Sequence, residues 1–407
     1  MVYLDHHATT PVDARVLEAM LPFFSEKFGN AASKQHRFGW DAADAVERAR
    51  TQLAVLIGAG SKDVIFTSGA TEANNLAIKG LAKARDLSTV ARSAKVEGSE
   101  GRRDHIVTIV TEHKAVLDPV ASLARDGWRT TVLPVPASGI VDVNAVADAI
   151  TDRTLLVSVM AANNEIGVLQ PIRAIADAAH AKGALMHTDA VQAVGKVPFD
   201  VEALDVDFAS MSAHKLYGPK GVGALYVRRK GPSFAKATEG KRDVKIAAEI
   251  DGGGHERGLR SGTLNVPGIV GFGRAAEIAR AEMASESTRV AMLRDRLLAG
   301  LQATTDGMTV NGATHARLPG NLNVSFAGVD GEALLLSLDD IAVSSGAACT
   351  QAEPSHVLMA LGLSKDRALA SLRFGVGRST TAADVDYAAQ KVSDVVARLR
   401  GVWRATA

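Results

Sequence analysis

Cysteine is nearly absent from this chain of 407 residues, which contains only Cys349. One thiol cannot form an intrachain disulfide and a cysteine-based metal centre needs several, so the sequence indicates a reducing compartment and no metal site. Aromatic residues make up 4% of the chain, too few for a base-stacking surface. The 46 basic residues are balanced by 45 acidic ones, which leaves no basic footprint for nucleic acid or an anionic membrane.

Long apolar runs are missing as well. No stretch approaches the roughly 18 consecutive apolar residues that a membrane-spanning helix requires. The N-terminus begins Val2-Tyr3-Leu4-Asp5, without the basic region and apolar stretch of a signal peptide or transit peptide. We therefore expect a cytoplasmic protein that does not bind membranes. Its length and its 47% apolar content predict a globular chain of about two domains.

Short apolar runs alternate with helical patterns through the first two thirds of the chain. Strands are expected at residues 64–67, 106–110, 130–135, 155–160, 184–187, 206–211 and 222–227. Helices are expected at residues 13–28, 34–57, 115–124, 143–150 and 172–181, with another after Glu72. This order is typical of an α/β fold, with a mostly parallel sheet covered by helices on both faces. Polar stretches at residues 84–103 and 228–250 are expected to be surface loops.

The last third of the chain has a different pattern. Residues 266–303 are predicted to form one helix that is long enough to connect two domains. After it, strands at residues 322–326, 341–343 and 372–374 alternate less regularly with helices, and a helix at 382–399 ends the pattern. This predicts a smaller α+β domain. We assign residues 14–265 to a large ligand-binding domain, and residues 1–13 and 266–407 to the small domain.

A Gly-containing turn, Ser68-Gly69-Ala70-Thr71-Glu72, joins the first of these strands to a helix. The free backbone N–H groups at the start of such a helix, with the hydroxyls of Ser68 and Thr71, are suited to a phosphate. The alternative is an ordinary helix cap, in which these side chains satisfy only the first turn.

Polar and titratable residues follow several of the predicted strands. In a parallel sheet the carboxyl ends of the strands meet at one edge, where ligands bind. The segments at these ends are Thr111-Glu112-His113-Lys114, Asn163-Asn164-Glu165-Ile166-Gly167, Thr188-Asp189-Ala190-Val191-Gln192 and Ser212-Ala213-His214-Lys215. Each could be a solvated loop alone, but together they predict a binding site.

Lys215 lies among small residues at the end of a predicted buried strand. It is either a surface lysine in a loop or an amine desolvated enough to form a Schiff base. With a phosphate site, a carboxylate and a histidine at the same edge, the set is what pyridoxal 5'-phosphate needs. Asp189 would keep the pyridine nitrogen protonated, Gln192 would hydrogen-bond the ring hydroxyl, and His113 would stack on the ring and transfer protons.

Cys349 lies in the segment Ser344-Ser345-Gly346-Ala347-Ala348-Cys349-Thr350-Gln351. A lone cysteine is most often a small buried hydrophobe. The small, polar and glycine-containing neighbours favour instead an exposed loop and a reactive thiol.

These motifs together resemble the group I cysteine desulfurases of the NifS/IscS type, in the class V aminotransferase family of fold type I pyridoxal phosphate enzymes. The resemblance runs almost from end to end. It rests on Tyr3 to Pro11, Phe28-Gly29-Asn30, His36 to Gly39, Phe66 to Glu72, Thr111 to His113, Asn163 to Gly167, Asp189 to Gln192, Ser212 to Gly221, Gly252 to Gly258, Arg260 to Thr263, Ser344 to Thr350, and Arg373-Phe374.

The resemblance implies a role for each matching residue. Lys215 would be the Schiff-base lysine, with Cys349 and His113 as the other catalytic residues. Cofactor binding is implied for Ala70, Thr71, His113, Asn164, Asp189, Gln192, Ser212, His214 and Lys215, and for Thr263 supplied by the second subunit of a homodimer. Asn164 and Arg373 would bind the substrate, with Arg373 pairing its carboxylate in a bidentate fork.

The implied reaction converts L-cysteine to L-alanine and leaves the sulfur as a persulfide on Cys349. That sulfur would pass to an acceptor protein, such as an iron–sulfur scaffold, for cluster assembly, other thio-cofactors or tRNA thiolation. The alternatives are a selenocysteine lyase or a class V aminotransferase on the same fold, and a cofactor-binding scaffold or regulator without turnover. The chain departs from the family pattern at Ala213, where glycine is usual, and in a shorter loop after Cys349. It also ends soon after Trp403, so we expect docking of partners to differ from that of relatives with a longer C-terminal extension.

Overall fold

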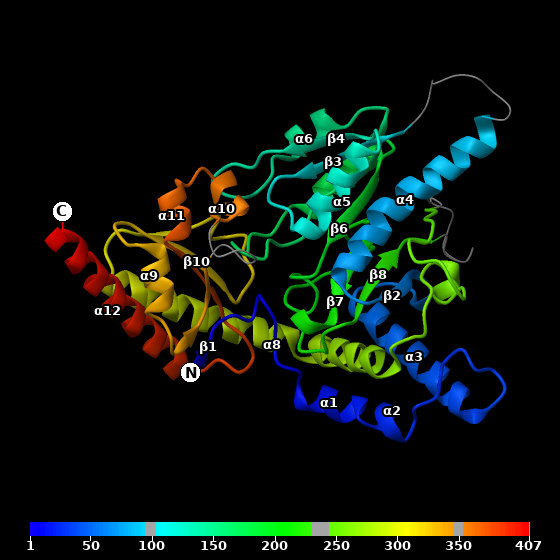
Figure 1. The fold of residues 1–407 in the computed structure, drawn as a ribbon, viewed down its shortest axis with the longest axis horizontal. Coiled ribbons are helices and arrows are strands. Elements are labelled where there is room, and N and C mark those ends of the chain that lie inside the picture. Colours follow the sequence, from blue (N-terminus) through cyan, green and yellow to red (C-terminus); the bar gives the residue numbers. More distant parts are fainter. Residues whose placement is uncertain (94–102, 230–243, 346–352, 407) are drawn as a thin grey trace.

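The computed structural model describes residues 1–93, 103–229, 244–345 and 353–406 (Figure 1). Its large sheet has seven strands in the order β2-β8-β7-β6-β5-β3-β4. Their bounds are β2 (Val64–Thr67), β8 (Gly223–Val227), β7 (Phe208–Ser212), β6 (Leu185–Asp189), β5 (Thr154–Ser158), β3 (His105–Ile109) and β4 (Arg129–Leu133). The strands from β7 to β4 are parallel, whereas β8 is antiparallel to both of its neighbours. The prediction of an α/β fold with a mostly parallel sheet is confirmed.

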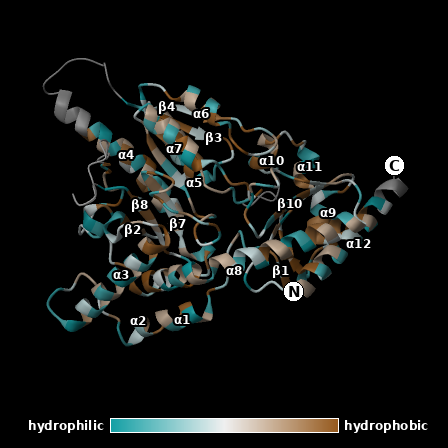
Figure 2. Cartoon of the chain, turned by 180° about the vertical axis from the view of Figure 1, so that it is seen from behind, coloured by the Kyte–Doolittle hydropathy of each residue, from teal (hydrophilic) through white to brown (hydrophobic). Residues whose placement is uncertain are grey.

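Helices cover both faces of this sheet, as the alternation of side chains along each strand requires. Along β8, Ala224 and Tyr226 belong to one hydrophobic core, and Leu225 and Val227 belong to the other. Figure 2 shows the strands mostly in hydrophobic colours. The helices of this part are α1 (Ala14–Met20), α2 (Pro22–Ser25), α3 (Arg37–Leu56), α4 (Ala70–Ser93), α5 (Lys114–Arg125), α6 (Val143–Ala149) and α7 (Ile172–Ala181).

A third core lies in the C-terminal part, around a four-stranded antiparallel sheet ordered β12-β13-β10-β9. Its strands are β9 (Met308–Val310), β10 (Asn321–Phe326), β12 (Ser344–Ser345) and β13 (Ser371–Gly375), and its helices are α9 (Gly331–Leu336), α10 (His356–Ala360), α11 (Lys365–Leu369) and α12 (Ala382–Thr406). The N-terminal strand β1 (Val2–Tyr3) pairs in parallel with β11 (Ile341–Ala342). The division of the chain into domains at residues 13 and 265 stays a prediction.

The helix α8 (Val266–Thr304) contributes to two of the cores (Figure 1). Its first half packs Ile269 and Phe272 against the large sheet, and its second half packs Leu297 and Leu301 into the C-terminal core. One continuous helix therefore joins the two parts, as residues 266–303 predicted.

Three predictions of local structure were wrong. The helix expected at residues 13–28 is divided into α1 and α2, because Pro22 begins a new helix at its first position. Residues 84–93, expected in a loop, continue α4, whose run of Ala, Arg and Lys favours a helix. Residues 244–250 are not simply a surface loop, since Val244 is buried against the core under α4. Residues 94–102 and 230–243 of these two stretches lie outside the described residues.

Among the described residues, no helix has both the length and the apolar character needed to cross a bilayer.

The outer edge of β2 is covered by a buried ion pair rather than by another strand. Arg50 of α3 donates from its two terminal nitrogens to both carboxylate oxygens of Glu256, at 2.7 and 2.8 Å. Glu256 also accepts from the backbone N–H of Phe66 at 2.7 Å, and Arg50 donates to the carbonyl of Val64 at 2.9 Å. The pair therefore satisfies the edge of the strand that leads to the Ser68–Glu72 turn.

We expect Glu256→Gln to lower the free energy of unfolding by about 3 kcal/mol, because it leaves Arg50 charged and buried with a weaker partner. Urea unfolding followed by circular dichroism would measure the change. The matched control is Asp386→Asn, which breaks the exposed Arg296–Asp386 pair and should leave the unfolding midpoint unchanged. Equal shifts for the two variants would contradict this account.

Candidate functional site

A cavity of about 1520 Å³ lies at the carboxyl edge of the large sheet and extends to the C-terminal part of the chain. Ten of the residues predicted for the site line it: Ala70, Thr71, His113, Asn164, Asp189, Gln192, Ser212, His214, Lys215 and Arg373. Seven of them lie at or after the ends of β3, β5, β6 and β7, which meet at one edge because these strands are parallel, while Ala70 and Thr71 follow β2 and Arg373 comes from β13.

Lys215 ends a short 3₁₀ turn that directly follows β7. Its Nζ donates to the backbone carbonyls of His7 and Ala8, at 2.6 Å each. Burial, and after it the neighbouring Arg373 guanidinium, lower the pKa of Lys215, while Asp5 and Asp189 act in the opposite direction, and the resulting pKa is about 8. The amine is thus partly desolvated rather than a surface lysine, which favours the second of the two interpretations made from the sequence.

Tyr217, two residues after Lys215, has a left-handed backbone with φ of 63°. This conformation costs a residue with a side chain roughly 1–2 kcal/mol. The N-terminal segment holds it from both sides, since Tyr217 N donates to Thr10 Oγ1 at 2.9 Å and its carbonyl accepts from Asp13 N at 3.0 Å. The strained turn is therefore supported by backbone bonds on both sides.

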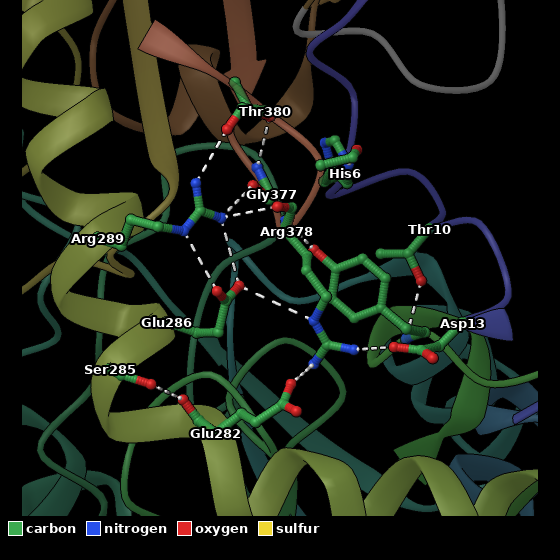
Figure 3. Close-up of polar contacts among 12 residues, drawn as sticks. His6, Thr10, Asp13, Glu282, Ser285, Glu286, Arg289, Gly377, Arg378 and Thr380 are labelled. Atoms are coloured by element: carbon green, nitrogen blue, oxygen red, sulfur yellow. Dashed lines mark hydrogen bonds and ion pairs between the residues drawn. The ribbon is translucent and has the colours of Figure 1, made fainter. Parts of the chain in front are cut away.

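Arg378, in the C-terminal part, contacts the same tyrosine through its backbone and through its side chain. Its backbone N–H donates to the Tyr217 hydroxyl at 2.6 Å, and its guanidinium lies 4.3 Å from the centre of the ring. The guanidinium pairs with Asp13 at 2.5 Å and lies 3.6 Å from Glu282 on α8. Arg289, also on α8, donates to the backbone carbonyls of Gly377, Arg378 and Thr380 (Figure 3). Residues from three distant segments thus hold the lysine turn.

Asp189 is the last residue of β6, and 6% of its surface is exposed. Its Oδ2 accepts from Asn74 Nδ2 at 2.8 Å, and its Oδ1 accepts from the backbone N–H of Val191 at 3.0 Å. Each oxygen of this carboxylate is therefore anchored by a donor while the group lines the cavity. Asn74 was missed from the sequence, although it follows Ala70 by one helical turn on α4.

His113 caps the start of α5, where its Nδ1 accepts from the backbone N–H of Ala115 at 3.0 Å. The remaining nitrogen, Nε2, then carries the proton in the neutral ring. The ring opens onto the cavity, where desolvation lowers the pKa of His113; Asp189 opposes this shift and Lys215 adds to it. The ring is accordingly neutral near pH 7.

Glu112, the neighbour of His113, is fully buried beneath the site. Its Oε1 accepts from the backbone N–H of Met160 at 2.5 Å, while Oε2 has no partner among the described residues. Burial raises the pKa of Glu112 well above its usual value, and the nearby Asp189 raises it further. The sequence analysis placed Glu112 among the polar residues at a strand end but did not predict its burial, because polarity after a strand does not distinguish a solvated loop residue from a buried acid.

The turn at Ser68–Thr71, which leads into α4, lines the cavity together with Ser212 and His214. Glu72 accepts from the backbone N–H of Ser68 at 2.8 Å and pairs with Arg260. This contact is part of the ordinary helix cap that was the alternative reading. Ala70 and Thr71 nevertheless line the cavity. Burial lowers the pKa of His214 to about 4, so its ring is a neutral donor here.

Arg373 on β13 is buried and already holds several partners. One terminal nitrogen donates to Asp5 Oδ1 and to Ser344 Oγ, at 2.8 Å each, and the other donates to the carbonyl of Asn164 at 3.1 Å. Its Nε has no partner among the described residues. Part of the fork predicted for a substrate carboxylate is therefore engaged by Asp5, although Arg373 still lines the cavity.

Two predicted residues do not join the others in this cavity. Thr263 is exposed on the loop before α8, and it does not line the cavity of its own chain. Cys349 lies outside the described residues. The described ends of its segment are anchored at the cavity: Ser344 donates to Asp5 at 2.9 Å, and Ser355 donates to the buried carboxylate of Glu165.

The chemistry of these donors fits pyridoxal 5'-phosphate. A helix N-terminus with the hydroxyls of Thr71 and Ser212 suits the phosphate. Lys215 supplies a desolvated amine, and the anchored carboxylate of Asp189 suits a pyridinium nitrogen. Within the described residues, no cluster of three metal-ligating side chains is found.

Comparison with known proteins gives a consistent picture. A family described as aminotransferase class-V matches residues 2–388. The chain is 55% identical over 401 residues to the cysteine desulfurase IscS of Anaeromyxobacter sp. (strain Fw109-5), covering 98% of this chain and 93% of the relative. A solved structure described as a NIFS-like protein is 38% identical with a TM-score of 0.86, covering 98% of this chain and all of that one. Another, described as SspA in complex with cysteine, is 34% identical with a TM-score of 0.77, covering 94% of this chain and 100% of that chain.

We expect the Lys215 amine to react with an aldehyde at lower pH than an ordinary lysine does. Only the neutral amine is a nucleophile, so its reactivity rises with pH through the pKa of about 8. At pH 7 roughly one tenth of the amine is then neutral, against less than about one thousandth for an unperturbed lysine. Borohydride trapping of pyridoxal phosphate on the apoprotein, read by mass spectrometry at Lys215, would give the midpoint.

The control for this measurement is Lys215→Ala, which should lose the label. Arg373→Met should move the midpoint upward, because the Arg373 guanidinium lowers the pKa of Lys215. A wild-type midpoint above pH 10 would contradict the expected desolvation of the amine.

Proposed function

This chain belongs to the class-V aminotransferase family and, within it, to the cysteine desulfurases, and we propose that it converts L-cysteine to L-alanine with pyridoxal 5'-phosphate. The observation that carries the proposal is the position of Lys215. Its amine is desolvated and directed by two carbonyls, in the same cavity as the anchored carboxylate of Asp189.

The residues that would hold the cofactor lie around that amine. Ala70, Thr71, Ser212 and His214 would bind the phosphate, Asp189 the ring nitrogen and Gln192 the ring hydroxyl. When bound, the cofactor supplies an electron sink for bonds broken at the Cα and Cβ of the substrate. Lys215 would hold it and move the proton at Cα.

The substrate carboxylate would lie beside Arg373 and Asn164. Arg373 is buried and lines the cavity, and a charge-assisted hydrogen bond from its guanidinium to a carboxylate is stronger there than in water. Asp5 holds the same guanidinium in place from the N-terminal segment. His113, neutral and carrying its proton on Nε2, would donate it to the substrate or ring and recover it later.

Cys349 would accept the sulfur. Its thiolate would attack the substrate sulfur, so that an S–S bond forms and the C–S bond breaks with its electron pair left on Cβ. A persulfide would stay on Cys349, and the three-carbon product would take up protons at Cβ and Cα and leave as alanine. Ser344 and Ser355 hold the described ends of this segment at the cavity. We propose that the persulfide serves a sulfur-acceptor protein of iron–sulfur cluster assembly, and that the enzyme works in the cytoplasm.

Mass spectrometry of the protein after incubation with L-cysteine tests this function. We expect a sulfur adduct on Cys349 and one alanine released for each sulfur taken up. Cys349→Ser should lose the adduct and at least about a hundredfold of the desulfurase rate, because a hydroxyl is a far weaker nucleophile toward sulfur.

The alternatives give different results in the same experiment. A selenocysteine lyase would act on selenocysteine and leave Cys349→Ser active. An aminotransferase would form a keto acid rather than alanine. A scaffold without turnover would bind the cofactor and release neither.

We also propose that the enzyme is a homodimer in which Thr263 reaches the phosphate of the second subunit. Thr263 is exposed and lies outside the cavity of its own chain. Six large apolar side chains close together in the sequence are exposed, each by at least 47% of its surface: Leu17, Leu21, Phe24, Phe28, Phe38 and Trp40. An apolar group of this kind, with the Phe28 and Phe38 rings 5.2 Å apart, favours a protein partner.

We expect Phe28→Glu to shift the protein from dimer to monomer, because it places a charge within this apolar group. Sedimentation velocity would measure the mass. The matched control is Met292→Glu, at an equally exposed apolar residue on α8, which should stay dimeric. A monomeric wild type would overturn the dimer without affecting the proposed reaction.

A further inference from the structure

Lys196 is a lysine that the proposed function does not use, although its amine lies inside the protein. It follows Gln192 by four residues in the turn after β6, and its Nζ donates to Gln192 Oε1 at 2.7 Å. In the part of the chain that the structure describes, it forms no ion pair with a carboxylate. An amine kept inside a protein without a counter-charge costs stability. Among the described residues, its side chain forms one hydrogen bond, to Gln192 of the site, and this bond indicates a role in holding Gln192.

The amide of Gln192 is held at both ends. Its Oε1 accepts from Lys196 Nζ and from Nδ1 of His7, the latter at 3.1 Å, while Nε2 donates to the backbone carbonyl of His7 at 3.0 Å. The flipped amide would place donor against donor at Lys196 and acceptor against acceptor at the His7 carbonyl. One Nε2 hydrogen is left for another acceptor in the cavity that Gln192 lines.

The same contacts set the state of the His7 ring. Because Oε1 only accepts, Nδ1 carries the proton, and the buried Nε2 has no partner among the described residues. Burial is the largest cause that lowers the pKa of His7 well below its usual value, and Lys196 and Arg373 lower this pKa as well. The ring is therefore neutral. The His7 carbonyl also accepts from Lys215 Nζ at 2.6 Å. Hydrogen bonds therefore run continuously from the Lys196 amine to the Lys215 amine.

We propose that Lys196 is a positioning residue, which fixes the Gln192 amide and, through it, the His7 segment that receives the Lys215 amine. The proposal rests on the proposed function, in which Gln192 and Lys215 contact the cofactor. Lys196 itself does not line the large cavity. It lines instead a smaller cavity of about 60 Å³, which shares His7 with the larger one.

The N–H donor of Lys196, rather than its charge, is the feature that this role requires. Burial lowers the pKa of Lys196 well below its usual value, and Lys215 and Arg373 lower it further. A neutral amine still donates to Gln192 Oε1 and repels Lys215 less than a charged one would. Lys196→Met keeps the long stem and removes only the donor, so it isolates this function.

The first test is a double-mutant cycle on the apoprotein, which involves no cofactor. Urea unfolding midpoints are compared for the wild type, Lys196→Met, Gln192→Ala and the double variant. If Lys196 acts through Gln192, Lys196→Met should change the midpoint much less in the Gln192→Ala background than alone, whatever the sign of the change. Additive shifts would overturn the proposal.

The second test is cofactor binding by the same four proteins, measured by fluorescence titration and by the visible absorption spectrum. Lys196→Met should raise the dissociation constant of pyridoxal 5'-phosphate about tenfold, as loss of one hydrogen bond would. Gln192→Ala should do the same, and the double variant should again show about tenfold rather than a hundredfold. Lys182→Met removes an amine that donates to two backbone carbonyls away from the cavity, and it should bind like the wild type.

The outcomes separate this inference from the proposed function. If the wild type binds no pyridoxal phosphate, the proposed function fails, while non-additive apoprotein midpoints still support the coupling of Lys196 to Gln192. If the wild type binds it and Lys196→Met binds it with the same constant and spectrum, the positioning role is wrong.

Discussion

The site depends on how one lysine amine is held inside the protein. Lys215 donates to two backbone carbonyls, of His7 and Ala8, rather than to a carboxylate. Carbonyl dipoles orient the amine without the strong charge stabilisation that an ion pair would add, so burial and Arg373 can keep its pKa low. A carboxylate at the same distance would hold the lysine protonated and unreactive. The chemistry therefore depends on a segment of backbone whose position has to be accurate.

Contacts between segments that are distant in the sequence fix the position of this backbone. Thr10 and Asp13 bond the backbone of Tyr217, Arg378 holds its ring and hydroxyl, and α8 supplies the acids and the arginine that hold Arg378. The strained turn at Tyr217 costs free energy, and these contacts offset it. The helix α8, which packs into the core of the large sheet and into the C-terminal core, thus contributes to the geometry of this single turn.

Much of this arrangement could be predicted from the sequence. Strands with runs such as Val64–Thr67 are buried on both faces, so local composition located them to within about two residues. The parallel order then brought His113, Asp189 and Lys215 to one edge. His7, Asp5, Asn74 and Lys196 were missed, because their roles arise from contacts across hundreds of residues or from one hydrogen bond within an irregular turn. The prediction of a loop at residues 84–93 was wrong because polarity alone does not distinguish a loop from an exposed helix.

The pairing of β1 with β11 has a consequence for the order in which the molecule is made. Val2 bonds in register with Ile341, so the strand that leads into the His7 and Ala8 carbonyls cannot be secured until most of the chain has left the ribosome. The large sheet, whose strands lie between residues 64 and 227, is complete well before that. Closure of the site is consequently a late step of folding, because the lysine turn at the end of β7 gains its contacts with the N-terminal segment only after β1 has paired.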